Sequence, residues 1–153
     1  MAASSISKSG IRNRAVAAGY RSGLEDKVQS DLTSRGVPHD YEAVKVRYSK
    51  PASHHKYTPD FRLLANGILV ETKGRFMTAD RTKHELIKKQ HPDLDIRFVF
   101  DRSKSPISKG SKTTYASWCA SRGFLFADKS VPQEWVDEPY LQSRIDALEA
   151  ARA

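Results

Sequence analysis

Residues 57–73 read YTPDFRLLANGILVETK. The segments 57–64 and 68–73 are rich in the aliphatic and aromatic residues typical of strands. Asn66-Gly67 between them is a strong signal for a tight hairpin turn, because both residues tolerate the positive φ angles that such turns require. The sequence therefore predicts an antiparallel hairpin, around which the rest of the fold is built.

Three polar residues are predicted to share one face of this hairpin. A tight turn at its tip pairs Asp60 with Lys73. It likewise pairs Arg62 with Glu71, and paired residues of antiparallel strands point to the same side of the sheet. Direct partners lie about 5 Å apart and diagonal ones about 7–8 Å, distances that one cation can bridge from two carboxylates. Asp60, Glu71 and Lys73 therefore form a candidate site, and a one-residue bulge would destroy it.

The segments around the hairpin predict a mixed α/β sheet with flanking helices. Residues 78–90 have helical character, and 96–100 form an apolar run typical of a buried strand. Together with 68–73 they make a βαβ unit, whose two strands run parallel in one sheet. Upstream, 22–36 predicts a short amphipathic helix and 44–48 alternates as a half-buried strand does, with a His- and Ser-rich loop after it.

The chain divides into three predicted parts. Residues 1–20 are small and basic with little periodicity, which predicts a flexible arm. Residues 21–138 form one domain, with a further helix at 114–122 and an edge strand at 124–126. Residues 139–153 are charged and Ala-rich, which predicts a tail or a loose helix.

Composition favours a polyanionic partner. The net charge is +8 and the pI is about 9.7, a balance that promotes phosphate contacts. Cys119 is the only cysteine, so an intramolecular disulfide and a Cys-based zinc site are excluded. No apolar stretch approaches the roughly 18 residues that a membrane span requires. We expect a cytoplasmic protein with no membrane partner.

The spacing Pro59-Asp60 followed by Glu71-Thr72-Lys73 suits hydrolysis of a phosphodiester. This reaction needs a water made nucleophilic near neutral pH and neutralisation of charge in the transition state. Mg²⁺ held by Asp60, Glu71 and the main-chain carbonyl of Thr72 would provide both, because Mg²⁺ prefers oxygen ligands. Lys73 would orient or help to deprotonate the water. The alternative is that Glu71 and Lys73 form an ordinary exposed pair at a strand end.

These residues resemble the PD-(D/E)xK nuclease superfamily and, more closely, the phage endonuclease I family of Holliday-junction resolving enzymes. The likeness extends over residues 11–138. Its stretches are RSGLEDKV at 21–28, YTPDF at 57–61, NGI at 66–68, VETKG at 70–74, HPDLDIR at 91–97, ADK at 127–129 and Glu134-Trp135.

The resemblance implies a role for each matching residue. Asp60 and Glu71 would hold Mg²⁺, with Mn²⁺ as a substitute and one or two ions per site, and Lys73 would serve the water. Glu25 would be a further catalytic residue and a ligand of the second ion. The residues alone explain Glu25 differently, as the third residue of a capping box begun by Ser22.

The resemblance also implies a restriction-endonuclease-like fold in an intertwined, domain-swapped homodimer. Glu25 would then act in trans, in the active site of the other subunit. A two-fold dimer with paired sites suits a four-way DNA junction, which two symmetric nicks resolve.

The expected substrate is branched DNA, recognised by shape through its phosphates. The residues expected to contact it are Arg12, Arg14, Arg75, Arg81, Lys83, Lys104 and Lys109. Two other functions stay open at this point. One is a nuclease of the same superfamily that cuts linear duplex DNA, and the other is a basic DNA-binding protein without catalysis.

Overall fold

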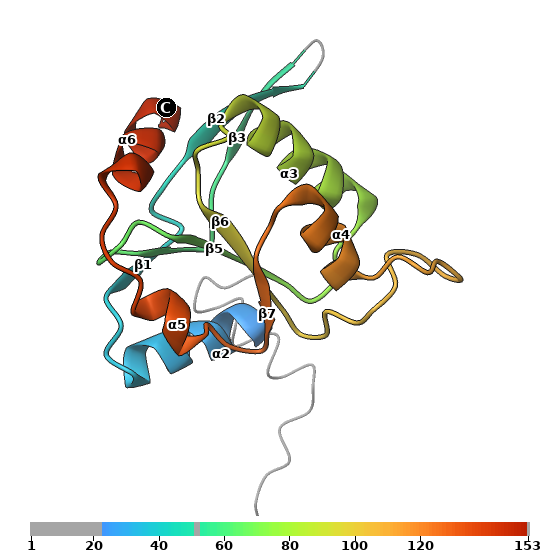
Figure 1. Ribbon diagram of the computed structural model, residues 1–153, viewed down its shortest axis with the longest axis horizontal. Helices are drawn as coiled ribbons and strands as arrows, with labels where there is room; N and C mark the ends of the chain where they lie inside the picture. The colour runs from blue at the N-terminus through green and yellow to red at the C-terminus, as the bar shows by residue number, and fades with distance from the viewer. Residues whose placement is uncertain (1–22, 51–52, 153) are drawn as a thin grey trace, which may run out of the picture.

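The computed structural model describes residues 23–50 and 53–152. The predicted arm at 1–20 and the cap at Ser22 lie outside this part of the chain. A five-stranded mixed sheet of order β1-β4-β5-β6-β7 forms the centre, and β2 and β3 form a separate hairpin (Figure 1). The strands are β1 (His39–Tyr41), β2 (Val46–Lys50), β3 (Ser53–Tyr57), β4 (Phe61–Leu63), β5 (Leu69–Lys73), β6 (Ile96–Phe100) and β7 (Phe126–Asp128).

Helices cover both faces of the sheet. They are α2 (Gly23–Ser34), α3 (Thr78–Gln90), α4 (Tyr115–Arg122), α5 (Gln133–Val136) and α6 (Gln142–Ala151). Figure 1 shows α3 and α4 on one side of the sheet and α2 and α5 on the other. In the part of the chain that is described, no helix combines the length and the apolar character needed to cross a membrane.

Two hydrophobic cores, one on each face, follow from the alternation of side chains along the central strands. Phe98 and Phe100 of β6 pack with α3 and α4. Val99 between them packs with α2 and α5 on the opposite face. The sheet is therefore buried on both sides, which explains why residues 96–100 are so largely apolar.

The predicted βαβ unit is confirmed. β5 pairs with β6 in parallel, and α3 has the bounds that the sequence predicts, 78–90. β7 lies two residues further along than the predicted edge strand at 124–126. The reason is that Phe124 completes the end of α4, where its amide binds the Cys119 carbonyl and its ring stacks on Trp118.

The predicted register of the β4–β5 hairpin is wrong by two residues. Phe61 pairs with Val70 and Arg62 with Leu69, so a four-residue loop replaces the tight turn. Asn66 is the cause: its side chain is buried and donates to the carbonyls of Trp135 and Glu138 instead of forming a two-residue turn. A shift of two residues preserves the face on which each side chain lies, so the predicted cluster of polar residues survives.

The predicted strand at 57–64 is divided, and the predicted His-rich loop is a strand. His54 and His55 lie in β3, which pairs with β2, while the chain leaves β3 after Tyr57 and enters β4 only at Phe61. Pro59 lies in this interval, and a proline cannot donate to a strand ladder. Because of this break, Tyr57 at the end of β3 and Asp60 just before β4 line the same cleft.

The C-terminal segment is a docked helix and not the loose one that its composition predicts. Leu148 of α6 is 2% exposed, and Ile145 lies against Gly67, where an added Cβ would come within 2.9 Å of it. Arg144 is buried and donates to Asp95 and Glu138. Leu148 thereby joins the hydrophobic core that contains Phe98 and Phe100.

Candidate active site

A cleft of about 130 Å³ lies where the break between β3 and β4 meets the end of β5. It contains all four residues that the sequence predicts to be catalytic, together with Lys83 of the predicted DNA-contacting set. The lining residues are Glu25, Lys56, Tyr57, Thr58, Asp60, Glu71, Lys73 and Lys83. The predicted grouping of Asp60, Glu71 and Lys73 is thus what the fold produces.

Asp60 is held at the entrance of β4 by Thr72. The amide and the hydroxyl of Thr72 both donate to the same carboxylate oxygen, Oδ2, over 2.8 Å each. Burial, followed by the nearby charges of Glu71 and Glu25, raises the pKa of Asp60 to about 8. Asp60 is therefore fixed in place but poorly stabilised as an anion.

Glu71 is the most enclosed carboxylate of the cleft. It is 4% exposed, and the hydroxyl of Tyr57 donates to its Oε2 over 2.5 Å. Burial raises the pKa of Glu71, against the opposing effects of Lys73 and of the Tyr57 hydrogen bond. Tyr57 itself keeps its proton, because burial and the charge of Glu71 raise its pKa well above the usual value.

Lys73 is held between two carboxylates. Its Nζ lies 3.1 Å from Oδ1 of Asp80 and 3.6 Å from Oε1 of Glu71. Burial disfavours the charge on Lys73, but Glu71 and Asp80 outweigh this effect and raise its pKa. Asp80 also accepts a hydrogen bond from the Met77 amide at the start of α3, so the helix terminus positions this lysine.

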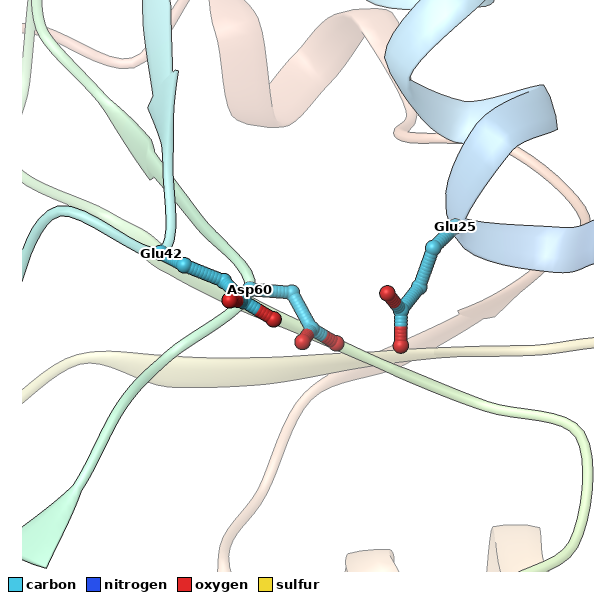
Figure 2. Close-up of side chains that lie close together, drawn as sticks. All are labelled: Glu25, Glu42 and Asp60. Atoms are coloured by element: carbon cyan, nitrogen blue, oxygen red, sulfur yellow. The ribbon is translucent and has the colours of Figure 1, made fainter. Parts of the chain in front are cut away.

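Glu25 reaches the cleft from the first turn of α2, within the same chain. One carboxylate oxygen from each of Glu25, Glu42 and Asp60 lies within 4.8 Å of the other two, and Figure 2 shows the three side chains pointing toward one another. Tyr41 donates a hydrogen bond to Glu25 over 2.6 Å. Because one chain is described, the exchange of α2 between subunits stays a prediction.

Three residues that lie against the predicted catalytic side chains were not themselves predicted from the sequence. Glu42 has no neighbouring motif, and a backbone φ of 48° in the loop after β1 sets its place beside Asp60. Tyr57 stands in the stretch before Pro59, but only the break in the strand aims it at Glu71. Of the three, only Asp80 has a sequence signal: it lies in the first turn of a predicted helix, where acidic residues are common.

Two neighbouring residues of α3 fix the ring of Tyr57. The Nζ of Lys83 lies 5.3 Å from the ring centroid, and His84 makes an edge contact with a centroid distance of 5.0 Å. Burial lowers the pKa of Lys83 and holds the pKa of His84 well below its usual value. The amine of Lys83 lines the cleft, while His84 is a neutral packing residue.

The other predicted DNA contacts divide by their surroundings. Arg75, Lys104 and Lys109 are exposed. Arg81 instead donates to the Phe76 carbonyl and to the Thr78 hydroxyl. Its guanidinium is therefore engaged in hydrogen bonds at the start of α3. Arg12 and Arg14 lie outside the described residues.

The donor set of the cleft suits a hard divalent cation. The four carboxylates of Glu25, Glu42, Asp60 and Glu71 offer only oxygen ligands, which Mg²⁺ and Mn²⁺ accept. Two of these carboxyl groups have pKa values raised by burial, so as anions they lack sufficient neutralising charge. A divalent ion among them would supply it. Thr72, whose main-chain carbonyl the sequence predicts as a ligand, contacts Asp60 through its amide and its hydroxyl.

The chain belongs to the phage endonuclease I family, whose model matches residues 2–153. The predictions of this family and of an endonuclease are confirmed.

Two bacteriophage proteins show how close the relation is. Endonuclease I of Escherichia phage T7 is 54% identical over 129 residues, which cover 84% of this chain and 86% of that protein. Endodeoxyribonuclease 1 of Enterobacteria phage T3 is 50% identical over 133 residues, or 87% of each protein.

Proposed function

We propose that this endonuclease hydrolyses phosphodiester bonds of branched DNA with Mg²⁺, and that it resolves four-way junctions by paired nicks. The observation that carries the proposal is the convergence of Glu25, Asp60 and Glu71 with Lys73 in one cleft. Clustered acidic oxygens beside a lysine suit a hydrolysis in which negative charge develops on a phosphate. The names of the relatives, one of which specifies a deoxyribonuclease, support DNA as the substrate.

Asp60 and Glu71 would hold the first ion, and Glu25 with Glu42 would complete the ligand set or hold a second ion. When bound, Mg²⁺ lowers the pKa of a coordinated water and offsets the charge of the phosphate. Mn²⁺ has the same preference for oxygen ligands and would substitute. Thr72 keeps Asp60 in position, as its two hydrogen bonds to Oδ2 leave the other carboxylate oxygen for the metal.

The lysines would act on the water and the phosphate. Lys73 lies beside Glu71 and is fixed by Asp80, so it would orient the attacking water and stabilise the hydroxide that forms. Lys83 lines the same cleft without an ion pair in the described part of the chain, and its Nζ would meet a phosphate oxygen. Tyr57 would keep Glu71 turned toward the metal.

The preference for branched DNA and the homodimer rest on the family resemblance. A junction has two opposing strands to be cut, and a two-fold dimer presents two equivalent sites to them. We also propose that α2 is exchanged between subunits, so that Glu25 acts in trans, and that the enzyme works in the cytoplasm of the phage's host.

One assay tests the activity. The protein is incubated with a four-way junction, or with a linear duplex of the same sequence, in the presence of Mg²⁺ or Ca²⁺. We expect paired nicks in the junction with Mg²⁺ only. Glu71→Gln, which keeps the shape but removes the charge, should abolish cutting and retain binding. Glu149→Gln on the exposed face of α6 is the matched control and should cut normally.

The other outcomes separate the competing functions. Equal cutting of the linear duplex would replace the junction preference by general duplex cleavage. Binding to DNA without cleavage under either metal would leave a non-catalytic DNA-binding protein. Equal activity of Glu71→Gln and the unaltered protein would contradict the site itself.

Mixed dimers test the exchange of α2. Glu25→Gln and Glu71→Gln are each inactive alone in this proposal, and the two are unfolded and refolded together. If Glu25 acts in trans, one site of the mixed dimer unites the intact Glu25 and the intact Glu71, and single nicks reappear. If Glu25 acts in cis, as the single chain places it, both sites of the mixed dimer carry one defect and no activity returns.

A further inference from the structure

The hairpin of β2 and β3 carries a second hollow, which no step of the proposed reaction uses. Its volume is about 430 Å³, and it lies between this hairpin and the C-terminal end of α3. Its charged and titratable lining residues include Arg47, Lys56, His54, His55 and His91, and none of its lining residues is acidic. We call this hollow the hairpin groove.

Two cations lie side by side in the lining of the hairpin groove. Arg47 and Lys56 are directly paired residues of β2 and β3, and both are exposed. Like charges placed directly opposite each other destabilise an antiparallel pair. Neither side chain has an ion pair or a hydrogen bond with residues 23–50 or 53–152. The cost is therefore not offset within the described chain, and an anion between the two side chains would remove it.

The walls of the hairpin groove are fixed before any ligand arrives. The side-chain amide of Gln90 accepts from the Ser49 amide and donates to the Ser49 carbonyl, over 2.7 and 2.6 Å. His91 binds the carbonyl of Arg47 through Nε2. The end of α3 is thus fastened to the edge of β2, and a preformed site loses less entropy when it binds a ligand.

The hairpin groove adjoins the candidate active site at Lys56. Lys56 lines both the groove and the catalytic cleft, and the next residue, Tyr57, binds Glu71. A polyanion that leaves the cleft past Lys56 therefore meets Arg47 next. A DNA backbone is such a polyanion, whereas a single phosphate would fill only part of a hollow of this size.

We propose that the hairpin groove binds the phosphodiester backbone of the DNA substrate next to the strand segment that is cut. This inference rests on the proposed function, since it adds a binding subsite to the same reaction. The contact would be electrostatic and independent of base sequence, as phosphate contacts are. It would raise the affinity for DNA and would not change the rate of the chemical step.

Arg47→Ala is the test, because Arg47 lines the groove but not the catalytic cleft. Binding to a four-way junction is measured with Ca²⁺ over a series of salt concentrations. We expect the affinity to fall by about tenfold and the slope of log affinity against log salt to decrease by about one, the effect of one lost phosphate contact. Arg47→Lys should restore the slope. Lys89→Ala, an exposed lysine of α3 outside the groove, is the matched control.

Cleavage and substrate length complete the test. At saturating DNA with Mg²⁺, Arg47→Ala should cut at the unaltered rate, and its defect should vanish on junctions whose arms are too short to reach the groove. If the unaltered protein cuts DNA and Arg47→Ala changes neither the affinity nor the salt slope, the hairpin groove does not bind DNA, and the proposed function still stands. Displacement of DNA by free inorganic phosphate at low millimolar concentration would assign the groove to a small anion instead. Failure of the unaltered protein to bind or cut any DNA would overturn both.

Discussion

Replacing Asp60 by asparagine should stabilise the metal-free protein while it abolishes cleavage. The two hydrogen bonds from Thr72 end on one oxygen, so the amide oxygen of the introduced asparagine can accept both. The substitution therefore preserves the geometry and removes only the charge. That charge is unfavourable in the folded state without metal, because burial and two neighbouring glutamates raise the pKa of Asp60 to about 8.

The size of the effect depends on pH. Below about pH 4, Asp60 is protonated in both the folded and the unfolded chain and contributes nothing. Between about pH 4 and 8, the unfolded chain releases the proton while the folded chain retains it, so the free energy of unfolding falls as pH rises. Moving a carboxyl pKa from 3.8 to about 8 corresponds to about 6 kcal/mol at about 1.36 kcal/mol per pKa unit. Rearrangement of the cleft absorbs part of this, and we expect Asp60→Asn to add about 3 kcal/mol at about pH 8.5.

The assay is thermal unfolding in EDTA at about pH 4, 6 and 8.5, which run from close to the ordinary pKa of Asp60 to above its raised pKa. For a chain of this size, about 3 kcal/mol raises the Tm by roughly 6–12 °C. The gain should be largest at the highest pH and close to zero at the lowest. Asp93→Asn, at an exposed position after α3, is the control and should show no such trend. A gain that is independent of pH, or a loss of stability at the highest pH, would refute the claim that the buried charge of Asp60 destabilises the metal-free fold.

Three further substitutions test the surroundings of the site. Tyr57→Phe removes a hydrogen bond to the Glu71 carboxylate, a contact of about 1.5–3 kcal/mol, so the Mg²⁺ concentration for half-maximal cleavage should rise about 10–100-fold; an unchanged metal requirement would contradict this role. Asp80→Asn frees Lys73 and should lower kcat about tenfold with little change in KM, whereas a purely structural Asp80 would lower the Tm and leave kcat intact. Leu148→Ala should reduce the free energy of unfolding by about 3 kcal/mol in urea, and a change below about 0.5 kcal/mol would mean that α6 is not docked.

The core of the site could be predicted because its residues are close in sequence. Asp60, Glu71 and Lys73 lie on or beside the two strands of one hairpin, and alternation along a strand decides which side chains share a face. This conclusion survives the error in register, since a shift of two residues keeps every side chain on its face. The local pattern thus predicts on which face of the sheet each side chain lies, but it does not predict which residues of β4 and β5 pair.

The error in the register has a long-range cause. Asn66-Gly67 has the composition of a tight turn, but the side chain of Asn66 donates to the carbonyls of Trp135 and Glu138. These partners lie about seventy residues away in the chain, so no local pattern indicates them. The docking of α6 is also long-range, because its Arg144 donates to Asp95, 49 residues away in the chain.

Local periodicity and composition were enough to specify the βαβ unit, the mixed sheet and the grouping of Asp60, Glu71 and Lys73 in one cleft. Those features depend on short-range rules: alternation in strands, helical spacing and the preferences of carboxylates for hard cations. Tertiary packing decided the partners of those residues. Glu42 beside Asp60, Tyr57 against Glu71 and Asp80 against Lys73 come together only when separate elements close around the cleft. Packing also sets their charge states, because burial raises the pKa of Asp60 and of Glu71, and burial is a property of the whole fold.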